Sequence, residues 1–140
     1  MNGIYSFLSS IGYSHPLHPI LVHLVIGPVI AAFLIALASL VFRRPTWLRT
    51  ARHLNVFAFI TWFVTVPLGI ADWQHFYGGQ IMTAIIAKLI LAGVLFVVLL
   101  ATIFVNRSLP VEHKFPIVMY GISTLLVLGL GYFGGNLVFG

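Results

Sequence analysis

The sequence from residue 16 to residue 42 reads PLHPILVHLVIGPVIAAFLIALASLVF and contains no Asp, Glu, Lys or Arg. A helix needs about 20 apolar residues to cross a hydrocarbon core about 30 Å thick, so this segment is long enough to span a membrane. Further charge-free segments cover residues 54–71, 73–87, 89–106 and 115–140. Their residues do not alternate between apolar and polar, as the strands of a membrane barrel would. We therefore expect four membrane-spanning helices, near residues 17–42, 53–71, 80–105 and 115–134.

The composition of the chain agrees with this interpretation. Of the 140 residues, 61% are hydrophobic and 6% are charged, whereas soluble domains have about 25% charged residues. So few polar side chains cannot cover a water-soluble globule, which excludes a soluble enzyme, a disordered tail and a nucleic-acid-binding protein. The lack of cysteine excludes disulfides, thiolate metal sites and covalent c-type haem attachment. We interpret residues 1–140 as one all-α domain, an integral membrane four-helix bundle.

The basic residues predict the orientation of this bundle. Six of the seven lie in the loop between the first and second helices and in the loop between the third and fourth helices: Arg43, Arg44, Arg49, Arg52, Arg107 and Lys114. Loops rich in Lys and Arg stay in the cytoplasm. Both termini and the loop 72–79 are then expected outside, on the periplasmic side of a bacterial inner membrane.

Two further segments have recognisable patterns. Residues 1–14 carry Ile4, Phe7, Leu8 and Ile11 at helical spacing, which suits a short helix lying in the outer interface or a frayed terminus. Gly131 and Gly135 stand four residues apart in the last helix. Such spacing allows another helix to approach closely. We expect that helix to belong to the same bundle, and a homodimer is the alternative.

Polar side chains gather at the expected outer end. His15, His18, His23, Asp72, His75 and Lys88 all fall in that half of the chain's helices and loops. With a helix rise of about 1.5 Å per residue, His23 lies roughly 10 Å and Lys88 roughly 12 Å below the outer surface. Polar groups at such depth normally face the bundle interior or a ligand. We therefore predict one polar chamber that opens outward above an apolar inner half.

Several ligands suit such a chamber. Haem b is the first, with His23 as the best axial ligand, His75 or His18 opposite, and Lys88 bonding a propionate or, when deprotonated, the iron itself. A copper or zinc ion held by His residues, with His23 and His75 as the main ligands, is the second. His18 and His23 lie about 140° apart on a regular helix, so a metal site must recruit from more than one segment. A quinone headgroup bonded by His and Asp72 is the third. Without a cofactor, Lys88 would pair with Asp72 and the His rings would bond backbone carbonyls.

Four short motifs stand at the ends of the expected helices. The first helix begins with a His-Pro-x-x-x-His motif at residues 18–23, and a Gly-x-x-Asp motif at 69–72 ends the second. Arg107 closes the third helix, and a Gly-Gly-x-Leu-Val motif at 134–138 ends the fourth. In this order the four motifs resemble a bacterial family of small membrane proteins known as domain of unknown function "two-two-three-one", and the resemblance covers nearly the whole chain. It departs at Lys88, where members usually have a His, and at Val25, where they usually have a Pro.

The resemblance implies four helices with outward-facing His and Asp side chains. Members often occur beside or fused to c-type cytochromes, which implies membrane electron transfer with haem b as the suspected cofactor. We therefore expect a b-type cytochrome-like electron carrier between the quinol pool and a periplasmic acceptor. The alternatives are a cofactor-free accessory subunit of a larger membrane redox complex and a periplasm-facing metal-binding membrane protein. The lack of a nucleophile elbow or a phosphate-binding loop speaks against hydrolase and transferase chemistry.

Overall fold

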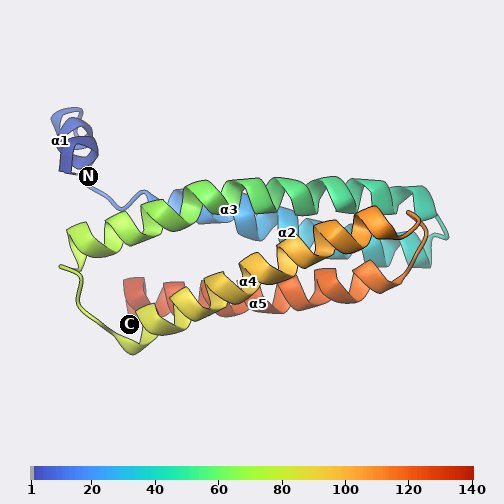
Figure 1. Cartoon of the computed structure of the whole chain (residues 1–140). Coiled ribbons are helices and arrows are strands. Elements are labelled where there is room, and N and C mark those ends of the chain that lie inside the picture. Colours follow the sequence, from blue (N-terminus) through green and yellow to red (C-terminus); the bar gives the residue numbers. More distant parts are fainter. Residues whose placement is uncertain (1) are drawn as a thin grey trace.

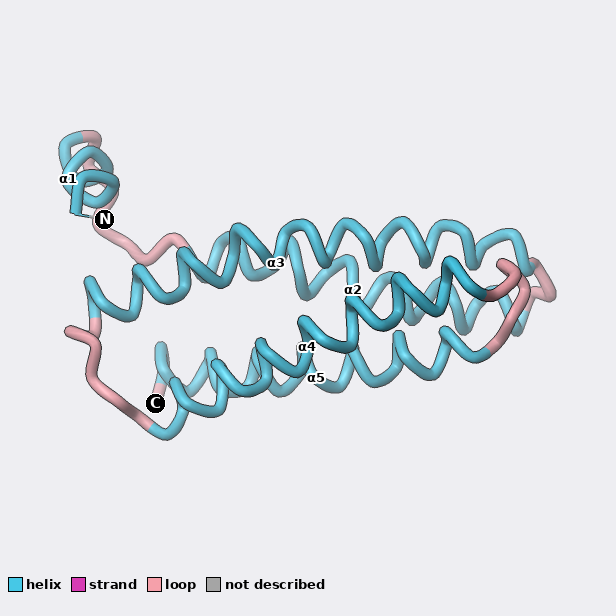
Figure 2. Tube along the Cα trace, viewed as in Figure 1, coloured by secondary structure: helices cyan, strands magenta, loops and turns pink. Residues whose placement is uncertain are grey.

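A computed structural model describes residues 2–140 as an all-α protein, and no strand occurs in that range (Figure 1). In chain order the elements are α1 (Asn2–Ser10), α2 (His18–Val41), the 3-10 helix η1 (Pro45–Trp47), α3 (Leu48–Phe76), α4 (Thr83–Ser108) and α5 (Phe115–Phe139). Figure 2 shows that short loops join the long helices. The helices α2, α3, α4 and α5 are each long and apolar enough to cross a membrane, which confirms the predicted fold class.

The four long helices lie side by side and alternate in direction (Figure 1). Helix α2 packs against α3 and α5, while α4 packs against α5 and α3. We call the end where α2 and α4 begin the histidine end, and the opposite end, which holds the α2–α3 and α4–α5 connections, the arginine end. Helix α1 lies beyond the histidine end, next to the last turns of α3 (Figure 1).

Helix α3 is longer than predicted at both ends, covering 48–76 rather than 53–71. Pro67, which suggested a kink or an early end, lies inside this helix. Ending a helix in lipid would leave backbone groups without partners, so a proline is more easily tolerated there than a break. Asp72 and His75 therefore sit in the last turns of a helix instead of in a loop. Of the two alternatives for the N-terminus, the structure has the short helix, and Met1 lies outside the described residues.

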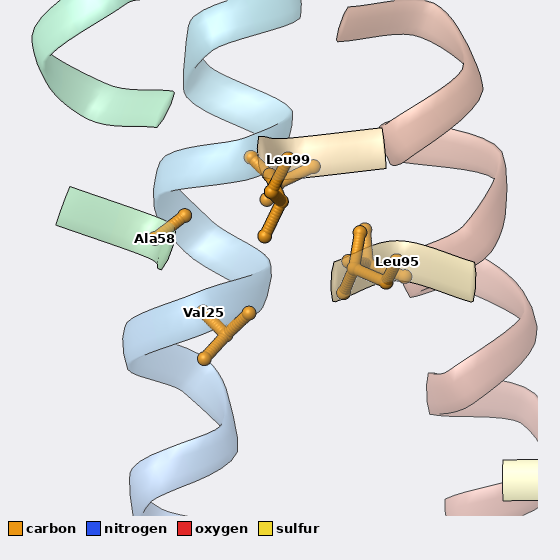
Figure 3. Packing of buried hydrophobic residues seen from close by; sticks show 6 residues of the cluster. Val25, Ala58, Leu95 and Leu99 are labelled. Atoms are coloured by element: carbon orange, nitrogen blue, oxygen red, sulfur yellow. The ribbon is translucent and has the colours of Figure 1, made fainter. Parts of the chain in front are cut away.

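The core consists of small and branched side chains. Figure 3 shows Val25, Ala58, Leu95 and Leu99 directed into the space between the helices, where Ala58, Leu95 and Leu99 are completely buried. A second cluster nearer the arginine end includes Ala32, Ala36, Ala51 and Tyr120. Small residues let helix backbones approach closely, which is how helices associate in a medium as apolar as their own side chains.

Candidate functional site

At the histidine end the four long helices line a cavity of about 510 Å³. Ligand-binding cavities commonly measure about 300–1,000 Å³. Its floor is formed by Val25, Leu95 and Val127 from the buried core cluster. Most of the wall is apolar, and the side chains with polar atoms are His18, His23, Trp62, Thr65, Asp72, Trp73, Tyr77 and Lys88. This cavity lies where the sequence predicts the polar chamber.

Three glycines of α5 form one wall of this cavity: Gly131, Gly134 and Gly135. A Cβ atom added to Gly131 or Gly135 would meet no other described atom within 4 Å, and one added to Gly134 would lie 3.8 Å from Lys88 Nζ. Gly131 and Gly135 therefore do not serve close packing inside the bundle, contrary to the interpretation of their spacing. Gly129 does, since a Cβ there would lie 3.3 Å from Leu91 Cδ1. The cavity-lining glycines instead leave open space beside α5 between the apolar side chains that also line the cavity.

The His18 ring is fixed in place at the start of α2. Its Nδ1 lies 3.1 Å from the carbonyl oxygen of Thr65 in α3. A carbonyl oxygen only accepts hydrogen bonds, so Nδ1 carries the proton and Nε2 keeps the lone pair of the neutral ring. A Cβ at position 69 would lie only 2.7 Å from His18 Nδ1, so the glycine there makes room for the ring. Metal-binding imidazoles are typically held this way, with one nitrogen donating to a carbonyl and the other free to ligate.

Asp72 is buried in α3 and accepts two hydrogen bonds from other elements. Its Oδ2 accepts the backbone N–H of His18 at 2.6 Å, and its Oδ1 accepts the hydroxyl of Tyr5 in α1. The first turn of a helix has free N–H groups and favours negative charge. Because Leu17, the residue before α2, makes no side-chain cap, the carboxylate of Asp72 caps this helix from outside. Burial and the neighbouring carboxylate raise the pKa of Tyr5, so its hydroxyl remains a donor.

Lys88 enters the same cavity from α4, half-buried. Within residues 2–140 its amino group forms no ion pair with a carboxylate, and the two oxygens of Asp72 accept hydrogen bonds from the Tyr5 hydroxyl and the His18 N–H. The Lys88–Asp72 pair considered in the sequence is therefore not formed. The amino group of Lys88 thus shares the cavity with the Asp72 carboxylate without pairing with it in the described part of the chain.

Of the three remaining histidines of this end, one lines the cavity and two do not. His23 is exposed and lines the cavity. His75 does not line it; its ring stacks on Tyr5, with centroids 4.2 Å apart and planes at 6°. His15 precedes α2 and packs edge-on against Tyr13. The structure thus brings His18, His23, Asp72 and Lys88 together and leaves His75 apart, so we omit His75 from the proposed ligands.

A zinc or copper site of several protein ligands is not supported by this geometry. Among residues 2–140, no group of three or more His, Cys, Asp or Glu side chains is placed to hold a metal ion. Metal ions with only protein ligands usually need at least three. The polar groups of the cavity therefore suit a ligand that brings most of its own coordination or that is held by charge and shape.

Sequence reasoning missed Tyr5, Thr65 and the role of Gly69. The spacing of Gly69 and Asp72 was a usable signal, because residues three apart share one face of a helix. Nothing in the sequence pairs Tyr5 with Asp72 or Thr65 with His18, since these partners lie 67 and 47 residues apart.

These observations define a small multi-pass membrane protein with four spanning helices and, at one end, a mostly apolar cavity that holds a few polar side chains. The family model described as "Predicted membrane protein (DUF2231)" matches residues 14–140, and the chain belongs to this family. The match confirms the resemblance carried by the four motifs. Neither the curated proteins nor the solved structures give a significant match. The matched residues begin after α1.

Proposed function

We propose that the cavity binds haem b and that the protein carries electrons at the outer face of a bacterial inner membrane, between the quinol pool and a periplasmic acceptor such as a c-type cytochrome. The observation that carries this proposal is the fixed His18 ring. Its Nδ1 donates to the Thr65 carbonyl while the residue lines the cavity, so Nε2 is the nitrogen available to a ligand. A neutral imidazole with a free Nε2 is a common protein ligand of haem iron.

The cavity offers a second imidazole as well. His23 also lines it, five residues further along α2. Five residues turn a helix by about 140°, so His18 and His23 reach the cavity in different directions and do not chelate together. We assign His18 as the iron ligand because its ring is held by neighbours. His23 is the other imidazole that lines the cavity.

Lys88 supplies the charge that a haem needs from its protein. Haem carries propionate groups, and the amino group of Lys88 has no carboxylate partner in the cavity. A buried charge is costly without a partner of opposite charge, and a propionate would provide such a partner for the amino group. The glycine wall of α5 beside Lys88 leaves space for a flat group. Lys88 is therefore assigned to a propionate.

The protein's own residues hold and shield such a group. When bound, haem supplies reversible one-electron chemistry. His18 fixes its position, Lys88 neutralises its anionic edge, and Val25, Leu95 and Val127 keep water from the cavity floor. An apolar surrounding of this kind is one of the means by which proteins tune the reduction potential of a haem.

The test is an absorption spectrum of the purified protein, oxidised and reduced with dithionite, together with an iron analysis. We expect a Soret band that shifts on reduction in the wild type and its loss in His18→Ala. The control His53→Ala, at the arginine end, should keep the wild-type spectrum. Purified wild-type protein that contains neither haem nor iron would refute the proposal. An unchanged spectrum of His18→Ala would show that His18 is not the ligand.

Lys88→Met separates the two roles considered for this residue. A propionate partner predicts the same low-spin spectrum with about tenfold weaker haem retention, the size expected for losing one hydrogen bond to a charged group. Loss of the low-spin spectrum would instead identify Lys88 as an iron ligand. His23→Ala reports in the same way on the other imidazole.

A further inference from the structure

Helix α1 is docked on the bundle through Tyr5. This side chain is 8% exposed, stacks on His75 and meets Phe76 edge-on at 5.7 Å. Its hydroxyl donates to Asp72 Oδ1. The large apolar side chains of the same segment, Ile4, Phe7 and Ile11, are exposed. Tyr5 therefore joins α1 to the last turns of α3.

The contact reaches the cavity through one carboxylate. Asp72 lines the cavity, and its other oxygen accepts the backbone N–H of His18 at 2.6 Å. Tyr5 and the first turn of α2 thus hold the two oxygens of Asp72. Lys88 lines the same cavity but forms no ion pair with this carboxylate in the part of the chain that the structure describes.

We propose that Tyr5 is a positioning residue for the cavity: its hydroxyl holds Asp72 against the start of α2, which steadies His18 and leaves Lys88 free for an anionic ligand group. This inference rests on the proposed haem-binding role of His18 and Lys88. Tyr5 lies outside residues 14–140 that the family model matches, so the contact is a feature of this chain beyond the matched part.

The physical reason is the cost of an unsatisfied carboxylate. Asp72 is 4% exposed, and a buried charge that loses a donor must find another. The amino group of Lys88 lines the same cavity and carries the opposite charge. An Asp72–Lys88 pair would remove the positive charge from the cavity and pull Asp72 away from the His18 N–H.

Hydrogen exchange of the ligand-free full chain in lipid nanodiscs tests the docking itself. Tyr5→Phe keeps the aromatic ring and removes the hydroxyl. We expect about tenfold faster exchange in α1 and at the start of α2, the effect of losing one hydrogen bond to a charged group. Tyr13→Phe is the matched control, because the Tyr13 hydroxyl bonds the carbonyl of Pro16 instead of Asp72. Equal exchange in Tyr5→Phe and the wild type would overturn the proposal.

The haem-loaded protein tests the effect on the cavity. Tyr5→Phe should lower the midpoint potential. Once Lys88 pairs with Asp72, its positive charge no longer opposes the positive charge of the oxidised iron. Adding Tyr5→Phe to Lys88→Met should then change the potential less than it does in the wild type. An unchanged potential in Tyr5→Phe would overturn the positioning role. If the wild type binds no haem, the proposed function fails, whereas the exchange experiment still decides whether Tyr5 holds the start of α2.

Discussion

Pro28 lies in the middle of α2 and has no amide hydrogen. The carbonyl oxygen of Leu24, four residues earlier, therefore loses its usual helix partner. Thr61 of α3 donates its hydroxyl to this oxygen at 3.0 Å, although the same hydroxyl also lies near two carbonyls of its own helix. In a bilayer such a carbonyl finds no water to bond. The side chain of Thr61 thus compensates for a proline in the neighbouring helix.

Thr61→Val should destabilise the bundle by about 1 kcal/mol, within the range found for hydrogen bonds between membrane helices. The measurement is a reversible unfolding or steric-trapping experiment in lipid. Thr124→Val is the control, because its hydroxyl bonds only a carbonyl of its own helix, that of Tyr120. In a Pro28→Ala background, where the amide of residue 28 bonds Leu24 again, Thr61→Val should cost clearly less. Equal costs in both backgrounds would contradict the assigned role.

The sequence predicted the depth of the site's residues in the membrane but not which side chains contact each other. The rise of a helix placed His23 and Lys88 at similar levels, and the structure puts both on one cavity. The choice of His18 over His23 as the fixed ring depends on the Thr65 carbonyl, a contact between helices. Rotation of one helix against another follows from packing of the whole bundle, so no local pattern contains it.

At the scale of single elements, α5 shows how a helix shapes a cavity by omitting side chains. Gly131 and Gly135 border the cavity with open space where a Cβ would stand. A larger side chain there has room to fit but occupies the space of the ligand. Gly93 of α4 is equally open, is exposed and does not line the cavity. The two positions form a matched pair of substitutions.

Gly131→Leu should abolish most of the haem absorbance while leaving stability within about 0.5 kcal/mol of the Gly93→Leu variant. Both substitutions replace a helical glycine, so their effects on helix propensity cancel in the comparison. The measurements are haem content per protein and unfolding in lipid. Full haem content in Gly131→Leu would place the ligand elsewhere and separate the cavity from the proposed function.

The helices themselves were predictable because length and charge decide them. A charge-free segment of about 20 residues has few alternatives in a membrane. The ends of α3 were not predictable in this way. Its extra turns, 48–52 and 72–76, contain Arg and Asp, and such charged residues indicated loops. Those turns extend the helix beyond the apolar segment, and the later one carries the Asp72 that joins α1, α2 and the cavity.

In the described part of the chain the larger cavity lies at the histidine end, about 510 Å³ against about 210 Å³ for a pocket at the arginine end. At the arginine end, Arg52 donates to the carbonyls of Leu109 and Pro110 at 3.0 and 2.8 Å, which ties α3 to the α4–α5 connection. At the histidine end, the four helices surround the cavity and α1 docks beside it. A ligand bound in this cavity would therefore lie close to only one face of the membrane.

Which face that is can be measured by labelling, since the chain has no cysteine of its own. Ser10 at the end of α1 and Ser108 at the end of α4 are both exposed and lie at opposite ends of the bundle. With the arginine end in the cytoplasm, a membrane-impermeant maleimide should label Ser10→Cys in intact spheroplasts and Ser108→Cys only after permeabilisation. The cysteine-free wild type controls for background. The reverse pattern would turn the cavity toward the cytoplasm, and a periplasmic electron acceptor would then be out of reach of His18.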